Sequence, residues 1–225
     1  MNQAIAQFSL LVGKDLHIEA RSRQTLSLVL VLGILIIAVL GLGLGAQTGP
    51  AALNATTVLW VAYLFSGVLC FEKTMAIERA DGVLAGLLMA PLDRGLIYLA
   101  KLASNLILMF AVAAVVTPVG VLFFAFDLSR APGTFALVML LSIVGFAAVG
   151  TLFSAVVSST RLQGGLLAMM VFPITLPLVV ASTQLMIRAT RDGVMPGGTG
   201  IGILVAFDAI FLTVSWLVFE WVLEP

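Results

Sequence analysis

Six long apolar stretches, separated by short polar segments, divide the chain. They lie near residues 25–44, 53–71, 96–124, 134–157, 165–187 and 201–223. Each is long enough to cross a hydrocarbon layer about 30 Å thick, which takes about 20 apolar residues in a helix. Strands of a membrane barrel would instead alternate apolar and polar residues over about ten positions. The pattern predicts an all-α polytopic membrane protein with six transmembrane helices, in one domain that covers residues 1–225.

The residues before the first apolar stretch have a different pattern. Ile5, Phe8, Val12 and Leu16 recur at helical spacing, and the polar residues Gln3, Lys14, Asp15 and Glu19 lie elsewhere around the helix. This predicts that residues 1–24 form a helix lying along the membrane interface, although an unstructured tail is the alternative because the apolar stripe is short. The first stretch is longer than the apolar core of a signal peptide, about 7 to 15 residues, so we expect it to be a retained span.

Composition agrees with a membrane protein and excludes other classes. Of the 225 residues, 61% are hydrophobic and 10% are charged, and the 11 basic and 11 acidic residues balance. This composition is too apolar for a soluble domain of this length. Without a clustered basic run, the chain lacks the electrostatic signature of a nucleic-acid-binding protein. A single cysteine, Cys70, provides neither a disulfide pair nor a metal-ligand spacing.

The distribution of lysine and arginine predicts the orientation in the membrane. With a cytoplasmic N-terminus, eight of these residues lie on the inner side and three on the outer side. The inner set is Lys14, Arg21, Arg23, Lys73, Arg79, Arg94, Lys101 and Arg161, and the outer set is Arg130, Arg188 and Arg191. Because cytoplasmic loops carry an excess of positive charge, we expect both termini to be cytoplasmic.

Charge is concentrated between the second and third stretches. Residues 72–82, "EKTMAIERADG", carry five of the 22 charges, and residues 72–101 carry eight. The segment favours a short charged helix up to Ala80, which Gly82 ends, followed by an apolar patch that ends at Pro91. We interpret residues 72–95 as a surface element that docks a soluble partner, and a solvated loop that only enforces topology is an equally consistent interpretation.

Few residues could support catalysis. The only histidine, His17, lies outside the predicted spans, and no phosphate-binding G-x-x-x-x-G-K-[ST] loop occurs. Asp208 is an acid inside the last predicted span, about seven residues or 10 Å from its outer end. Such residues are costly to bury in a membrane, so Asp208 is a candidate functional residue. Its alternatives are to reach outward or to pair with Arg188 or Arg191.

The fifth predicted span contains two prolines, Pro173 and Pro177. Each lacks an N–H group, which leaves the carbonyls of Met169 and Pro173 without their usual helical partner, so we expect a kink or local unwinding. Thr175, Ser182 or a neighbouring helix could donate to those carbonyls. The kink is either a hinge or a static packing feature.

Two segments resemble a known family. "ERADGVLAGLLMAPLDRGLIYLAKLASNL", residues 78–106, resembles the region between the second and third spans of type 2 ABC export permeases. With Phe71-Glu72, the proline-bearing "STRLQGGLLAMMVFPITLPLVV" at 159–180, the length and the six-span layout, the chain more closely resembles the CcmB family. Members of that family, also called haem exporter protein B, are membrane subunits of the ABC system for cytochrome c maturation.

The resemblance implies a non-catalytic permease subunit of the bacterial inner membrane. Glu78, Arg79 and Gly82, with Glu72 beside them, would belong to a coupling helix that fits a cytoplasmic ATP-binding subunit. Two copies would pair with two such subunits and with haem-handling membrane subunits, within the membrane lipid. ATP hydrolysis by the partner would drive haem export or release of a haem-loaded chaperone.

We expect no cofactor bound directly to this chain, because its spans offer only Cys70, Tyr63, Tyr98 and scattered methionines such as Met169 and Met170 as haem-ligand types. The alternatives are a type 2 permease that exports a drug, lipid or polysaccharide, an intramembrane enzyme, and a structural scaffold. An enzyme would need several catalytic residues at one depth. A scaffold would tolerate charge reversal at Glu78.

Overall fold

The computed structural model describes residues 2–44, 51–80, 86, 93–124, 131–159, 165–192 and 198–222. Those residues form seven α-helices and no strand, which confirms the all-α prediction. The helices are α1 (Asn2–Ser22), α2 (Gln24–Leu44), α3 (Ala51–Ala80), α5 (Arg94–Phe124), α6 (Pro132–Ser159), α7 (Leu166–Asp192) and α8 (Gly198–Val222). Six of them, α2 to α8, are long and apolar enough to cross a membrane, and they correspond to the six predicted spans.

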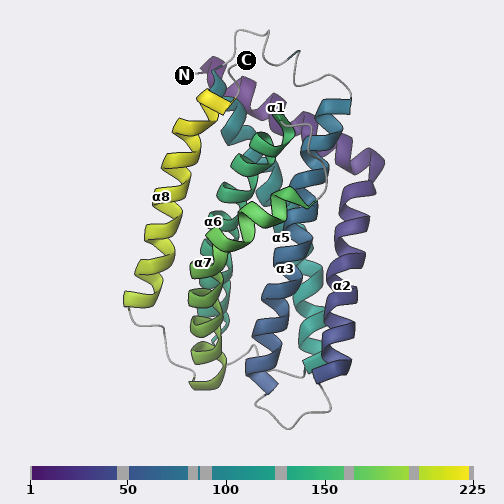
Figure 1. Cartoon of the computed structure of the whole chain (residues 1–225), viewed down its shortest axis with the longest axis vertical. Coiled ribbons are helices and arrows are strands. Elements are labelled where there is room, and N and C mark those ends of the chain that lie inside the picture. Colours follow the sequence, from purple (N-terminus) through teal and green to yellow (C-terminus); the bar gives the residue numbers. More distant parts are fainter. Residues whose placement is uncertain are drawn as a thin grey trace.

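Helix α1 lies across one end of the bundle formed by the other helices, and we call this the α1 end (Figure 1). Residues 2–22 are therefore helical, whereas a position in the membrane interface stays a prediction. Arg23 ends α1 by adopting a left-handed backbone conformation, with φ 51°. The N–H of Arg23 donates to the carbonyl of Glu19 at 2.7 Å, and α2 begins at the next residue.

Helix α3 is longer than the predicted span. The charged stretch that starts at Glu72 does not form a separate short helix, because α3 continues without interruption to Ala80. Residues 72–80 contain neither Gly nor Pro and consist mainly of good helix formers, so nothing in this stretch ends the helix. Gly82, Pro91 and the apolar patch between them lie outside the described residues, apart from Gly86.

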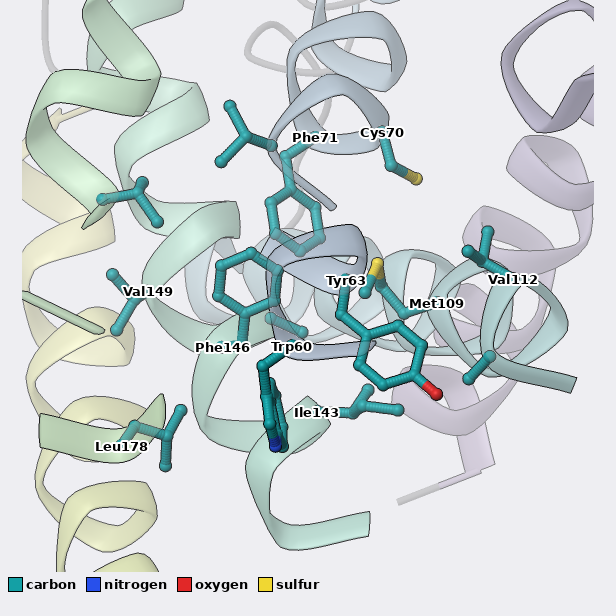
Figure 2. Packing of buried hydrophobic residues seen from close by; sticks show 14 of the residues in the cluster. Trp60, Tyr63, Cys70, Phe71, Met109, Val112, Ile143, Phe146, Val149 and Leu178 are labelled. Carbon is teal, nitrogen blue, oxygen red and sulfur yellow. The ribbon is translucent and has the colours of Figure 1, made fainter. Parts of the chain in front are cut away.

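The core of the bundle lies between α3 and α6. In each of these two spans, 67% of the most apolar stretch is buried, compared with 22% in α2 and in α8. The rings of Phe71 and Phe146 meet between them, with centroids 5.3 Å apart (Figure 2). Gly67 of α3 lies against Phe146, and Gly150 of α6 lies against Phe71. Each glycine therefore makes room for the aromatic ring of the facing helix.

Helix α7 remains helical through Pro173 and Pro177, but it changes direction along its length (Figure 1). The helix therefore bends without a break, and a kink at the two prolines stays a prediction. The prediction that Thr175 or Ser182 donates to the carbonyl of Met169 or Pro173 is wrong. Thr175 donates to the carbonyl of Val171 at 2.9 Å, and Ser182 donates to that of Leu178 at 2.6 Å. A helical hydroxyl reaches the carbonyl three or four residues earlier, and neither residue has that spacing from Met169 or Pro173.

Candidate functional site at the α1 end of the bundle

A buried ion pair joins α1 to α5. Lys101 Nζ lies 2.7 Å from Asp15 Oδ2, and the two side chains are 8% and 12% exposed. Lys14 Nζ lies 3.1 Å from the other carboxylate oxygen of Asp15, and the Lys14 side chain is 31% exposed. Asp15 therefore accepts from an inner lysine on α5 and an outer lysine on α1. Lys101, which was counted above among the charges of the cytoplasmic side, makes a buried contact between two helices.

One turn further along α5, Asn105 connects three helices. Its Nδ2 donates to Thr151 Oγ1 of α6 at 2.9 Å. Its Oδ1 accepts a hydrogen bond from Thr74 Oγ1 of α3 at 3.2 Å. Asn105 is 1% exposed, so both amide groups are satisfied inside the protein. We call Asp15, Lys101, Asn105, Thr74 and Thr151 the polar cluster.

A small cavity lies within the polar cluster. Its volume is about 30 Å³, and Asp15, Glu19, Thr74, Lys101 and Asn105 are among the residues that line it. A cavity needs at least about 10 to 15 Å³ to hold one water molecule, and polar groups surround this one. The cluster therefore joins α1, α3, α5 and α6, and the cavity beside it has room for bridging water.

Glu19 and Asp93 have structural roles at helix starts. Glu19 is 6% exposed and its Oε1 accepts the backbone N–H of Leu26 at 2.6 Å, in the first turn of α2. Asp93 precedes α5, and its Oδ1 accepts the N–H of Gly95 at 2.9 Å. Both carboxylates satisfy N–H groups that have no partner within the helix. Part of the charge in the 72–101 segment therefore serves to start α5.

The predicted coupling residues are only partly visible. Glu72 is half-buried on α3. Glu78 and Arg79 belong to the last turn of α3, but their side chains are not described, and Gly82 lies outside the described residues. The polar end of α3 nevertheless lies at the α1 end of the bundle, together with the start of α5 (Figure 1).

Asp208 lies further from the start of its helix than predicted. Helix α8 begins at Gly198, ten residues before Asp208, so the carboxylate is about 15 Å from that end at 1.5 Å per residue. The residue is 6% exposed, and Oδ1 lies against Gly145 of α6. Within the part of the chain that the structure describes, Oδ1 has no hydrogen-bond partner.

Of the two predicted partners of Asp208, only Arg188 has a described side chain. Among the described side chains, no ion pair joins Asp208 to Arg188, which is exposed on α7. Arg191 belongs to α7, but its side chain is not described. Asp208 occupies the face of α8 that is packed inside the bundle, shared with Leu204 and Ser215. Spacing along the sequence could not show this packing.

The polar cluster was not predicted from the sequence, although the sequence contains a signal for it. Lys101 and Asn105 are spaced i and i+4 inside a predicted span, so both lie on one helix face. Polar residues on one face of a transmembrane helix indicate an internal contact. The partner helices could not be identified from this spacing, because Asp15 is 86 residues away from Lys101.

Among the described residues, the fold combines six candidate spans with no cluster of three or more His, Cys, Asp or Glu side chains able to hold a metal ion. Six such helices define a multi-pass membrane protein. The family model described as CcmB protein matches residues 6–224, and the chain belongs to the CcmB family. Comparison with curated proteins finds no match for this chain.

Membership of this family defines the role of the chain. It is the permease subunit of the ABC haem exporter for cytochrome c maturation, and it is not itself a catalyst. An ABC ATPase is its partner. The family assignment favours cytochrome c maturation over the alternative of a permease for a drug, lipid or polysaccharide.

Proposed function

We propose that the α1 end of the bundle faces the cytoplasm and receives the ABC ATPase through residues 72–95. Glu72, Glu78, Arg79 and Gly82 would contact the ATPase. The observation that carries this proposal is that α1, the charged end of α3 and the start of α5 share one end of the bundle. The excess of lysine and arginine on that side supports the same orientation.

Movement of the ATPase would reach the membrane helices by two routes. Helix α3 is continuous from its charged end to Ala51, so a displacement of residues 72–80 moves the span as one body. Helix α5 follows the 72–95 segment directly, and it carries Lys101 and Asn105. Their contacts with Asp15 and Thr151 would pass the same displacement to α1 and α6. The polar cluster would therefore keep four helices moving together.

Haem would be handled by partner subunits and not ligated by this chain. The buried tyrosines and the cysteine, which belong to residue types that can ligate haem iron, are packed inside the protein. Tyr63 is 1% exposed and its hydroxyl lies 2.6 Å from Thr117 Oγ1, and Cys70 is 1% exposed. The Tyr98 hydroxyl donates to the carbonyl of Ala148 at 3.4 Å and is also buried. A second copy of the chain and haem-handling membrane subunits would complete the complex, which would release haem or a haem-loaded chaperone.

Two features inside the membrane would serve the transport cycle. The kink of α7 at Pro173 and Pro177 would act as a hinge, which its continuous but bent path supports. Asp208 would be a functional acid, because a buried carboxylate in a membrane span is costly unless it is used, and its Oδ1 has no hydrogen-bond partner among the described residues.

The docking proposal is tested by charge reversal at Glu78. Tagged protein would be purified from native membranes in mild detergent, and retained partners identified by mass spectrometry. We expect wild type to retain the ABC ATPase and haem-handling membrane proteins, and Glu78→Lys to lose the ATPase. The control is Arg188→Glu, a reversal on an exposed residue of α7, which should retain it. Retention of the ATPase by both variants would refute a coupling role for Glu78.

A further inference from the structure

An apolar groove runs along the junction of α1 and α2. Its volume is about 760 Å³, which lies within the range of roughly 300 to 1,000 Å³ typical of small-ligand sites. Leu26, Leu30, Val31 and Ile34 of α2 form most of one wall. Val31 is 60% exposed, so this wall is open within a single chain.

The charged group at one end of the groove is Arg23. It lines the groove and is exposed, and it has no ion-pair partner among the described residues. Its backbone is held in a left-handed conformation between α1 and α2, so the residue stays at the junction. The other charged residue lining the groove, Glu19, has its carboxylate engaged by the N–H of Leu26.

The dimensions of the groove match one leaflet of a bilayer. From Arg23 to Ile34 is eleven residues, or about 16 Å at 1.5 Å per residue. A hydrocarbon core is about 30 Å thick, so an acyl chain that starts at the headgroup level spans about half of it. The first membrane span begins at Gln24. Arg23 directly precedes it, so this arginine lies at the level of the lipid phosphates.

We propose that this groove binds one phospholipid with an anionic headgroup. The guanidinium of Arg23 holds the phosphate, and one acyl chain lies along Leu26, Leu30 and Ile34. An arginine suits this role because its planar guanidinium binds two phosphate oxygens at once. The headgroup is anionic because Arg21, two residues earlier and also exposed, adds a second positive charge near it. Bound there, the lipid would brace the angle between α1 and the first span.

The test measures lipid retention by the purified ABC complex. The complex is incubated in detergent with phosphatidylglycerol or phosphatidylcholine of the same acyl chains, and bound lipid is counted by native mass spectrometry. We expect phosphatidylglycerol to be retained preferentially. Arg23→Asn should weaken that retention about fivefold, which corresponds to about 1 kcal/mol for one cationic contact near the surface. Asparagine is chosen because it tolerates the left-handed backbone of residue 23.

Two further variants make the result specific. Arg21→Asn removes the same charge outside the groove and should change retention less than Arg23→Asn. Val31→Trp fills the groove and should lower retention of both lipids, while ATPase association shows that the complex is still folded. Equal retention of the two lipids, or equal losses with Arg21→Asn and Arg23→Asn, would overturn the proposal.

The groove could instead be covered by protein, and crosslinking distinguishes that case. Val31→Cys is introduced into a Cys70→Ala background, and native membranes are treated with a bifunctional thiol reagent and with a lysine–thiol reagent. Crosslinks from position 31 to a second copy or to a partner subunit would overturn the lipid assignment. The lipid proposal predicts no such protein crosslink.

Discussion

Lys101 of α5 and Asp15 of α1 form an ion pair of 2.7 Å that is almost entirely buried. Removing one partner of a buried ion pair typically costs about 3 to 5 kcal/mol. We therefore expect Asp15→Asn to lower the free energy of unfolding by about 3 kcal/mol. The measurement is denaturant or thermal unfolding of the purified protein in detergent.

Lys14 provides the matched control for this prediction. It contacts the same carboxylate at 3.1 Å but is more exposed, so Lys14→Gln should cost no more than about 1 kcal/mol. Exchanging the charges, with Asp15→Lys and Lys101→Asp together, should recover part of the stability lost in Asp15→Asn. If Asp15→Asn and Lys14→Gln lowered the free energy of unfolding equally, the buried Asp15–Lys101 pair would contribute no more than the exposed Lys14 contact.

The contact of Gly150 with Phe71 predicts a steric effect. A methyl group at position 150 would collide with the Phe71 ring, and both residues lie in the packed core between α3 and α6. Overpacking of this kind typically costs about 1 to 3 kcal/mol. We expect Gly150→Ala to lower the melting temperature of the purified protein. Gly133→Ala, at a glycine of α6 with nothing within 4 Å, should leave it unchanged or slightly higher.

The six spans could be predicted from the sequence because length and apolar composition alone satisfy the membrane constraint. At the polar end of α3, the charge pattern suggested a separate short helix. Because no Gly or Pro occurs between Glu72 and Ala80, α3 continues to Ala80 instead. The Asp15–Lys101 pair and the Gly150–Phe71 contact depend on how helices distant in sequence pack together. No local pattern contains that information. Asp208 was identified, but its depth depended on where α8 begins.

Straightening α7 tests whether its kink is a hinge. Pro173→Ala with Pro177→Ala restores two N–H donors, so the helix should straighten and the protein should melt at a higher temperature. We expect the distance between spin labels at Met170 and Arg188, in a Cys70→Ala background, to increase. Cytochrome c maturation, measured as covalently bound haem in cells, should fall.

Pro118 offers a control for the α7 experiment. It lies inside α5, so Pro118→Ala makes the same chemical change in another spanning helix. Loss of maturation in the α7 variant but not in Pro118→Ala would support a hinge. If α7 straightens and maturation is unchanged, the kink is only a packing feature.

Asp208 is predicted to reduce stability while serving function. Its Oδ1 lies against Gly145 of α6 without a hydrogen-bond partner among the described residues, and an aspartate near the centre of a spanning helix costs about 2.5 to 3.5 kcal/mol. Asp208→Asn removes the charge and keeps the shape, so we expect a melting temperature equal to or above that of wild type. Because the carboxylate would no longer be available, haem attachment to c-type cytochromes should fall. A lower melting temperature would mean instead that the carboxylate has a stabilising partner, with the Arg191 side chain the first candidate. Unchanged stability together with unchanged maturation would remove Asp208 from the functional residues.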